Sequence, residues 1–289
     1  MLRIALPNKG RLSERSRILF TQAGLDVLVR EERALTASLG GEFEAIFVRA
    51  QDIPEFVADG AADAGITGSD LIAEAERDLE PLLDLEFGAC RMVVACREEA
   101  PIRDVTEIPA DTRVATSFPT IARRYFGKLE RTVQVVPISG AAEIAPHLGI
   151  ADVIIDITST GSTLRTNGLR EIATVMSSSA GLYSARGRKD SWPAAKLQSL
   201  DQLVAALASV IRAQDKRYLM ANVPRAALEQ VKSILPGING PTVVDILNGG
   251  VFVAVHAVVR SEAVYRTIAA LKSLGAEGIL LTRIERLVP

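Results

Sequence analysis

Apolar and polar positions alternate along the first two hundred residues in blocks that predict short strands separated by helices. Each strand-length apolar run is followed by a stretch with apolar residues at helical spacing, and the order then repeats. This order is typical of parallel α/β layers. In the first ninety residues the predicted strands are 2–6, 44–49 and 64–67, and helices begin near Arg11, Asp52 and Gly68.

The helix that follows the second of these strands has a start signal of its own. Asp52 is followed by Ile53 and Pro54, and Glu55 stands three residues after Asp52. This spacing predicts a capping box, in which the two acidic side chains accept hydrogen bonds from backbone N–H groups at the helix start. The helix is expected to end near Gly60.

A second series of strands and helices follows a long apolar strand at 91–96. Its predicted strands are 113–116, 134–138 and 153–157, with one helix from Pro119 and another over 140–148. The words Gly60-Ala61-Ala62-Asp63 and Thr67-Gly68-Ser69, on either side of a strand, resemble Gly149-Ile150-Ala151-Asp152 and Thr160-Gly161-Ser162. A chance echo is the alternative. We favour two similar lobes with a ligand cleft at the carboxyl ends of their strands.

The pattern changes after a helix predicted over 194–214, which is expected to pack back on the first lobe. From residue 216 the order is strand, helix, strand, strand, helix, strand, the βαββαβ order of ferredoxin-like domains. The predicted organisation is therefore lobe I at 1–90, completed by about 179–215, lobe II at 91–178, and a C-terminal domain at 216–289. A separate small domain suits regulation or assembly, although fold alone proves neither role.

Composition and charge narrow the possible partners. With 289 residues, 48% of them hydrophobic, the chain can fill at least one large core, and its net charge of −2 gives no general attraction for nucleic acid or an anionic membrane. The segment before Pro7 is too short for the apolar core of a signal peptide, and no apolar run approaches the roughly 20 residues of a membrane span. We expect a cytoplasmic protein.

Histidine and cysteine are too scarce for several common kinds of site. Cys90 and Cys96 fit neither a CxxC pair nor a zinc knuckle, so reduced thiols are expected. With only His147 and His256, a histidine-built metal site or a Ser-His-Asp triad is not expected, and both histidines are interpreted as structural.

The stretch DVIIDITSTGSTL, from Asp152 to Leu164, joins an apolar strand directly to a run of Ser, Thr and Gly. Backbone N–H groups can converge in such a loop at a helix start, and its hydroxyls can donate hydrogen bonds to a phosphate. Asp156, at the carboxyl end of the strand, can accept hydrogen bonds from ribose hydroxyls. A plain strand-to-helix turn at Gly161 is the alternative, and it is the commoner meaning of an isolated Gly/Ser loop.

A wider pattern around this loop is more specific. It resembles the signature of the ATP phosphoribosyltransferases, the first enzymes of histidine biosynthesis, at every fixed position: Glu143, Gly149, Ala151, Ile154, Asp156-Ile157, Thr160-Gly161 and Thr163-Leu164. The segments LRIALPNKGRLSE, VRAQDIPEFVADG, FGACR, RVATSFP and PTVVDILNGG extend the resemblance over essentially the whole chain. The common phosphoribosyltransferase motif has two adjacent acidic residues before its loop, whereas Ile157 follows Asp156 here.

The resemblance implies a fold, a reaction and a form of regulation. The fold is a two-lobed α/β body similar to periplasmic binding proteins, plus an ACT-like C-terminal domain that binds histidine as feedback inhibitor in a dimer-to-hexamer assembly. The reaction joins N1 of ATP to C1 of phosphoribosyl pyrophosphate and releases pyrophosphate. An adenine nitrogen attacks with its own lone pair, so positioning, cations and Mg²⁺ are expected to supply the catalysis.

Candidate site residues follow from the resemblance and from their places in the predicted elements. The catalytic candidates are the cations Lys9, Arg11, Arg49 and Arg91. The candidates for binding phosphoribosyl pyrophosphate are Glu143, Asp156, Ser159, Thr160, Gly161, Ser162, Thr163 and Leu164, and those for ATP are Gly10, Leu12, Gly68 and Asp70. Metal ligands are not assigned. Cations at a helix start are disfavoured by the helix dipole, which suggests an anionic ligand there; Arg49 and Arg91 can instead form interlobe salt bridges.

In the C-terminal domain the resemblance implies a histidine pocket at Asn222, Thr242 and Ala257. Position 222 is often acidic in the family, so Asn222 lacks a charge for the histidine ammonium and puts the strength of inhibition in doubt. The competing interpretation is a cytoplasmic two-lobed protein that binds or senses a small molecule without catalysis. It explains the lobes but not a phosphate loop beside Asp156 with Lys9 and Arg11 opposite.

Overall fold

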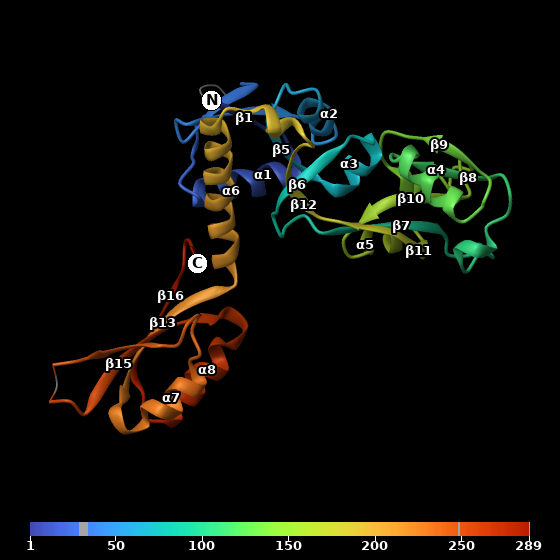
Figure 1. Cartoon of the computed structure of the whole chain (residues 1–289). Coiled ribbons are helices and arrows are strands. Elements are labelled where there is room, and N and C mark those ends of the chain that lie inside the picture. Colours follow the sequence, from blue (N-terminus) through green and yellow to red (C-terminus); the bar gives the residue numbers. More distant parts are fainter. Residues whose placement is uncertain (29–33, 248, 289) are drawn as a thin grey trace. The chain divides into compact units, whose positions relative to one another are not determined.

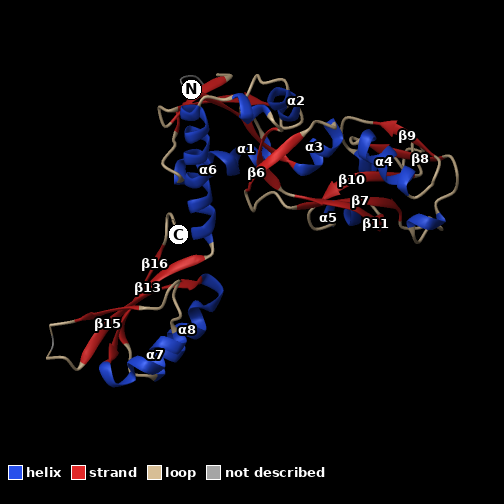
Figure 2. Ribbon diagram, viewed as in Figure 1, coloured by secondary structure: helices blue, strands red, loops and turns tan. Residues whose placement is uncertain are grey.

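The structure is a computed structural model that describes residues 1–28, 34–247 and 249–288 (Figure 1). Its contacts divide the chain into two compact units, Met1–Val204 and Ala205–Pro289. Helices and strands alternate through both units (Figure 2). The first unit contains two sheets, which define the two lobes described below, and the second contains one.

Lobe I is built on a seven-stranded sheet of order β2-β3-β4-β1-β5-β12-β6. At its centre β1 lies parallel to both β4 and β5, so the carboxyl ends of three strands share one edge. The strands are β1 (Leu2–Pro7), β2 (Val27–Leu28), β3 (Thr36–Leu39), β4 (Phe43–Val48), β5 (Ala64–Gly68), β6 (Leu79–Asp84) and β12 (Ala180–Ala185). Its helices are α1 (Gly10–Gln22), α2 (Ile53–Ala58) and α3 (Ser69–Ala75).

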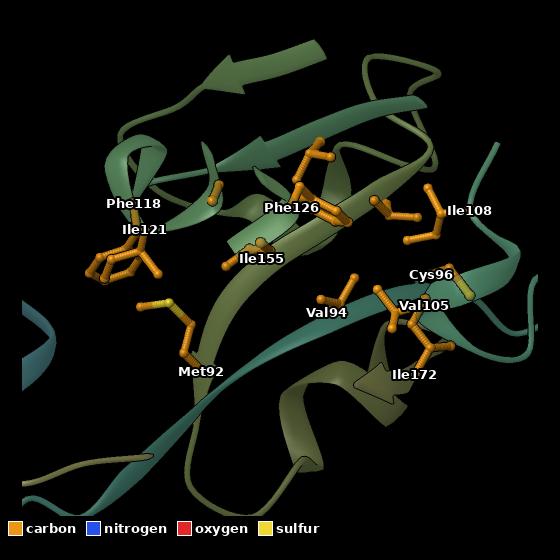
Figure 3. Packing of buried hydrophobic residues seen from close by; sticks show 13 residues of the cluster. Met92, Val94, Cys96, Val105, Ile108, Phe118, Ile121, Phe126, Ile155 and Ile172 are labelled. Carbon is orange, nitrogen blue, oxygen red and sulfur yellow. The ribbon is translucent and has the colours of Figure 1, made fainter. Parts of the chain in front are cut away.

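Lobe II is built on a five-stranded sheet of order β11-β7-β10-β8-β9. The strands are β7 (Cys90–Arg97), β8 (Thr112–Thr116), β9 (Val133–Pro137), β10 (Val153–Thr158) and β11 (Leu169–Ser178). Helix α4 (Pro119–Lys128) covers one face, where its buried residues meet those of β7 and β10 (Figure 3). The other face packs against Leu164 of the short helix α5 (Ser162–Thr166) and against Ala142 and Ala145.

The two lobes exchange strands and repeat one topology. In lobe I, β12 arrives from lobe II and pairs antiparallel with β5, and in lobe II, β7 arrives from lobe I and pairs antiparallel with β10. The orders β4-β1-β5-β12-β6 and β9-β8-β10-β7-β11 therefore correspond strand by strand. The predicted two similar lobes are confirmed at the level of the fold.

The repetition extends to a hydrogen bond at the start of each equivalent strand pair. The carboxylate of Asp63 accepts from the backbone N–H of Arg3 at 2.9 Å, and that of Asp152 accepts from the backbone N–H of Arg113 at 2.9 Å. Asp63 and Asp152 are the residues before β5 and β10, and both ended the echoed words of the sequence. Each carboxylate fixes the register of a parallel pair.

The second unit has a ferredoxin-like sheet of order β14-β15-β13-β16, all antiparallel. Its elements are β13 (Lys216–Pro224), α7 (Leu228–Ile234), β14 (Thr242–Asp245), β15 (Phe252–Arg260), α8 (Val264–Ser273) and β16 (Glu277–Arg283). Side chains from β13, β15, α7 and α8 form its core. The predicted βαββαβ order is confirmed, and α6 (Ala194–Gln214), which precedes β13, has the predicted bounds.

Two local predictions are wrong. Over 140–148 there is only a 3₁₀ turn at Ala142–Ile144, because Ala141 is left-handed and Pro146 would clash with the preceding turn inside an α-helix. The helix after Asp52 forms as α2, but without a capping box. The backbone of Asp52 is already helical, with φ −90° and ψ −15°, so its side chain accepts no capping hydrogen bond.

Candidate functional site

The carboxyl edge of the lobe I sheet gathers three loops that contain predicted site residues. The backbone N–H of Asn8 donates to the carbonyl of Val48 at 2.8 Å, which joins the turn after β1 to the end of β4. The hydroxyl of Thr67 donates to the carbonyl of Ala50 at 2.9 Å, which joins the end of β5 to the same segment. The turn before α1, the residues after β4 and the start of α3 therefore lie side by side.

Three predicted cations lie along this edge. Lys9 is the N-cap residue of α1, Arg11 is in its first turn, and Arg49 follows β4; all three are exposed. Throughout residues 1–28, 34–247 and 249–288, none of the three forms an ion pair. Three uncompensated positive charges near a helix start favour an anionic ligand at this edge.

A cavity of about 480 Å³ opens beside these cations, between lobe I and lobe II. It brings together four predicted residues, Arg11, Leu12, Gly68 and Asp70. Sequence reasoning missed other lining residues, among them Arg15, Leu71, Phe118, Ile157 and Ser178. Lys9, Gly10 and Arg49 are not part of its wall. The cavity combines arginine side chains with an apolar surface, which suits a ligand with one charged and one flat apolar part.

Asp70 is fixed at the wall of this cavity by a serine from the β11–β12 crossing. The Ser178 hydroxyl donates to Asp70 Oδ1 at 2.6 Å, and the backbone N–H of Asp70 donates to Ser178 Oγ at 3.1 Å. Both side chains are buried. Gly68 permits this arrangement, because a Cβ there would lie 2.1 Å from Asp70 Oδ1.

The thiol of Cys90 lies at the same wall. Burial and the carboxylate of Asp70 raise the pKa of Cys90, so the thiol stays protonated near neutral pH. Cys90 and Cys96 are both free, as predicted. A protonated thiol is a poor nucleophile, which favours a packing role for Cys90.

The predicted phosphate loop leaves β10 at the carboxyl edge of lobe II. The backbone N–H of Gly161 donates to Thr158 Oγ1 at 2.8 Å, and Thr160 Oγ1 donates to Ser162 Oγ at 3.0 Å. Gly161 has φ +73°, a conformation that favours glycine. Leu164 is buried in the core, whereas the exposed residues of the loop and of α5 are Ser159, Thr160, Ser162, Thr163, Arg165 and Thr166.

The helix after this loop is short. α5 has five residues, so its dipole is small, and any anion would be held chiefly by hydroxyls and loop amides. The binding of phosphate by this loop stays a prediction.

Two acidic side chains lie close to each other beside the loop. Burial and the carboxylate of Glu143 raise the pKa of Asp156, while a hydrogen bond from the backbone N–H of Ile157 at 2.8 Å opposes the shift. Glu143 lies in the 3₁₀ turn after β9 and is half-buried. Two carboxylates that repel each other favour a hydroxyl or cationic partner between them.

Arg91 is held within its own lobe. Its guanidinium makes a bidentate ion pair with Glu171 of β11, with Nη1 to Oε2 at 2.9 Å and Nη2 to Oε1 at 3.2 Å. The interlobe salt bridge considered for Arg91 is therefore wrong, because β7 and β11 belong to the same sheet. Glu171 also lies under the loop, 2.8 Å from where a Cβ on Gly161 would stand.

The three residues of the predicted histidine pocket do not share one face of the second unit. Asn222 of β13 and Thr242 of β14 lie on the face away from the helices, because their partners on β15 are Ala254 and His256. The side chain of Ala257 is buried in the helix-covered core. On the open face, Tyr218 Oη and His256 Nδ1 are 2.8 Å apart.

The missed residues carried weak sequence signals. Ser178 belongs to a run of three serines, SSS at 177–179, which reads as a loop, yet it is where the chain crosses from β11 to β12. Glu171 stands in a polar-alternating strand, and nothing local marks it. Neither long-range pairing is visible without the fold.

Metal-ligand clusters and membrane-length helices are both absent from the part of the chain that the structure describes. Within it, no three His, Cys, Asp or Glu side chains are grouped to hold a metal ion. Among the same residues, no helix is both long and apolar enough to cross a membrane.

The fold and the site define a class: a two-lobed α/β protein with cations on one lobe and a hydroxyl-rich loop on the other. Comparison with known proteins then identifies the family. A profile described as ATP phosphoribosyltransferase matches residues 49–209, and one described as HisG, C-terminal domain matches residues 213–286. This chain belongs to the ATP phosphoribosyltransferase family, in the long form that carries the C-terminal domain.

Curated relatives agree over the full length. The ATP phosphoribosyltransferase of Gemmatimonas aurantiaca is 63% identical, with 100% of both chains covered. That of Haloarcula marismortui is 50% identical, over 99% of this chain and 100% of the relative. Among solved structures, the ATP phosphoribosyl transferase (HisG:HisZ) complex from Thermotoga maritima has a TM-score of 0.65 at 27% identity, over 73% of this chain and 99% of that one. The family makes this chain a transferase of histidine biosynthesis, and the interpretation as a binding protein without catalysis is disfavoured.

Proposed function

We propose that this chain transfers the phosphoribosyl group of phosphoribosyl pyrophosphate to N1 of ATP. The predicted site residues of both lobes are proposed to bind the substrates and to stabilise the leaving group. The main supporting observation is that the lobe I edge presents cations without an ion pair among the described residues, while lobe II presents a hydroxyl-rich loop after β10. The full-length likeness to relatives with this name supports the same reaction.

The phosphoribosyl substrate is proposed to bind in lobe II. Ser159, Thr160, Ser162 and Thr163 donate hydroxyl hydrogen bonds to its phosphate, and Gly161 lets the backbone approach it. Asp156 and Glu143 accept hydrogen bonds from the ribose hydroxyls. Their mutual repulsion favours such donors, and a sugar held there would present C1 to a partner from the other lobe.

ATP is proposed to bind in the cavity between lobe I and lobe II. Arg11 and Arg15 can meet its phosphates, while Leu12, Leu71 and Phe118 offer an apolar surface to the adenine. N1 attacks with its own lone pair, so no general base is needed in the first step. The pyrophosphate leaves with growing negative charge, and Lys9 and Arg11 are placed to stabilise that charge.

Magnesium is proposed as the metal, held mainly by substrate. Mg²⁺ usually takes one or two protein carboxylates together with phosphate oxygens, so a complete protein cage is not required. Asp156 and Glu143 fit this pattern, because their mutual repulsion is relieved by a cation. When bound, the ion neutralises charge on the pyrophosphate.

Histidine is proposed as a feedback inhibitor that binds the second unit in a homo-oligomer, within the cytoplasm. Asn222 and Thr242 lie on the open face of that sheet, and Ala257 can contribute only through its backbone. The HisG C-terminal match supports a dedicated domain. The solved Thermotoga maritima structure is a complex of HisG with HisZ, which supports assembly with further subunits; a homo-oligomer of dimer to hexamer size is our proposal for this chain.

The test mixes the purified full chain with ATP, phosphoribosyl pyrophosphate, Mg²⁺ and pyrophosphatase, and follows the ultraviolet absorbance of N1-substituted ATP with and without histidine. Product that histidine suppresses supports both the transfer and the regulation. Product formation that histidine does not reduce would support the transfer and contradict the regulation. Asn222 would then be the first residue to examine. Absence of product while either substrate binds would return the chain to the class of binding proteins.

A further inference from the structure

Helix α3 belongs to lobe I and contacts both lobes: α2 and β5 in lobe I, and α4 and β11 in lobe II. Figure 1 shows it on the side of lobe I that faces lobe II. Its residues Leu71 and Ala73 pack against the buried cluster of lobe II. At its first turn Asp70 lines the cavity and bonds to Ser178. One turn later, on the same side of the helix, the carboxylate of Glu74 contacts α4.

The carboxylate of Glu74 caps α4. Its Oε1 accepts from the backbone N–H of Thr120 at 3.0 Å and its Oε2 from the backbone N–H of Ile121 at 3.0 Å. These donors are among the N–H groups that an α-helix leaves unpaired at its start. A negative charge there is also favoured by the helix dipole.

Helix α4 has no cap of its own. Its N-cap residue is Phe118, which has no side-chain acceptor, and no acidic residue stands in its first turn. Pro119 at the first position has no N–H to satisfy. The acceptor that α4 lacks in its own sequence is therefore supplied by the other lobe.

We propose that Glu74 is a positioning residue, whose bidentate cap on α4 fixes lobe II against lobe I and so aligns the two substrate sites. The proposal rests on the proposed transfer for its kinetic consequence. Phe118 lies one residue before the capped turn and lines the cavity, while Asp70 lies one turn before Glu74 on the cavity wall. Loss of the cap would free both walls of the cavity to move apart. The chemical groups would stay intact, but their alignment would be lost.

The test compares Glu74→Ala and Glu74→Gln with Glu76→Gln, a matched loss of charge on an exposed residue just after the same helix. For Glu74→Ala, kcat is expected to fall about tenfold, while the Kd of phosphoribosyl pyrophosphate alone changes less than about twofold, because one lobe binds it. Glu74→Gln should lie between, because its amide oxygen can accept from one N–H. Amide hydrogen exchange at Thr120 and Ile121 should accelerate in Glu74→Ala and stay unchanged in Glu76→Gln.

A second variant separates positioning from simple helix capping. Adding Thr120→Asp to Glu74→Ala gives α4 an acid in its own first turn, which restores helix stability without any link to lobe I. The expected result is a recovered melting temperature with kcat still low. Recovery of kcat together with stability would overturn the proposal, as would wild-type kinetics in Glu74→Ala. Tighter binding of inorganic phosphate by Glu74→Ala would also overturn it, since Glu74 would then block an anion site.

The two proposals fail in different ways. A wild-type chain that makes no product rejects the proposed transfer. The positioning role of Glu74 is then tested by small-angle scattering. If Glu74→Ala loses a ligand-induced compaction that Glu76→Gln retains, the positioning role is supported. If both variants retain the compaction, the positioning role is rejected.

Discussion

The β5–α3 connection of lobe I and the β10–α5 connection of lobe II follow the same arrangement of strands, but their polar groups differ in burial. Both strands follow an aspartate that accepts a backbone N–H from the neighbouring parallel strand. β5 then passes directly into α3 at Ser69, whereas residues 159–161 separate β10 from α5. In lobe I the second residue of the helix, Asp70, is buried and bonded to Ser178. In lobe II the corresponding hydroxyls are exposed.

This difference shows how one strand arrangement, repeated in two lobes, can serve two roles. Hydrogen-bonding groups that are already satisfied within the protein fix shape, and exposed groups in a constrained loop are available for a ligand. The lobe I connection belongs to the first kind, and its ligand contacts come from Arg11 and the cavity wall. The lobe II connection belongs to the second kind. The comparison can be tested at four points.

The largest effect is expected for Gly161→Ala in the lobe II loop. The residue has φ +73°, and a Cβ there would lie 2.8 Å from Glu171 Oε1 and 2.9 Å from Arg165 Nη1. Several loop donors would move together, so kcat/KM for phosphoribosyl pyrophosphate should fall about 1,000-fold. Steady-state kinetics with that substrate varied is the measurement.

Gly168→Ala is the control for the Gly161 variant. It has φ +60°, and the nearest atom to its Cβ is His147 Cε1 at 3.8 Å, so it introduces similar backbone strain without a clash beside the loop. Its kinetics should stay close to wild type. Equal losses in the two variants would mean that backbone strain alone, anywhere near α5, disables the lobe, and the loop would lose its special role.

The next effect is expected for Arg11→Ala in lobe I. An unpaired cation at the edge of the cavity should stabilise pyrophosphate charge, and its loss should cost about 3 kcal/mol of transition-state stabilisation, or roughly 150-fold in rate. Arg123→Ala removes an equal charge from the exposed side of α4 and should change the rate little. A similar small loss of rate in both variants would show that the lobe I cations do not contribute to the reaction.

Asp156→Asn should lower activity and raise stability together. The lost charge weakens hydrogen bonds from the sugar by about 2 kcal/mol, or roughly 30-fold in kcat/KM. Burial and Glu143 raise the pKa of Asp156, so the folded state binds more protons than the unfolded state, and stability falls as pH rises through the folded-state pKa. Asparagine removes that cost at neutral pH.

The measurement for Asp156 is thermal unfolding as a function of pH, alongside kinetics. The variant should melt higher than wild type near pH 7, and the difference should shrink in acid, where wild-type Asp156 is protonated. A variant that melts lower at neutral pH would show that the charge of Asp156 is compensated within the protein, as the charge of Asp152 is.

Sequence patterns predicted the frame better than the site. The central strands of each lobe followed from periodicity, and the loop at Gly161 followed from a motif that lies within fifteen residues of Asp156, whereas the strands β2, β3, β6, β11 and β12 were not predicted. The partners of Asp70, Glu74 and Arg91 are all long-range: 108 residues apart for Asp70 and Ser178, and 80 for Arg91 and Glu171. No local pattern encodes such pairs, because they depend on how strands exchange between the lobes. The helix predicted over 140–148 is wrong for the opposite reason. The cause, Pro146, is local and visible in the sequence, and it overrides the apolar pattern around it.

The smallest effect concerns the duplicated frame itself, through Asp63→Asn and Asp152→Asn. Both aspartates accept one backbone N–H at 2.9 Å, but their ion pairs differ. Asp63 pairs with Lys196 at 2.6 Å and its side chain is 13% exposed; Asp152 pairs with Arg113 at 2.7 Å and its side chain is 44% exposed. Solvent screens the second pair more strongly, so Asp63→Asn should cost about 1 kcal/mol and Asp152→Asn about half as much.

Amide hydrogen exchange at Arg3 and Arg113 reports on the two bonds separately. The side-chain hydrogen bond from the Arg113 guanidinium is the main reason that the pKa of Asp152 is lowered, and the backbone hydrogen bond from Arg113 adds to it. Their contribution is present above the unfolded-state pKa and is lost as pH falls through the folded-state value. Protection at Arg113 should therefore weaken in acid, and Asp152→Asn should remove that dependence. Equal costs for the two variants would show that the backbone hydrogen bond, and not the ion pair, sets the stability of each strand pair. The lobes would then differ only where their loops meet a ligand.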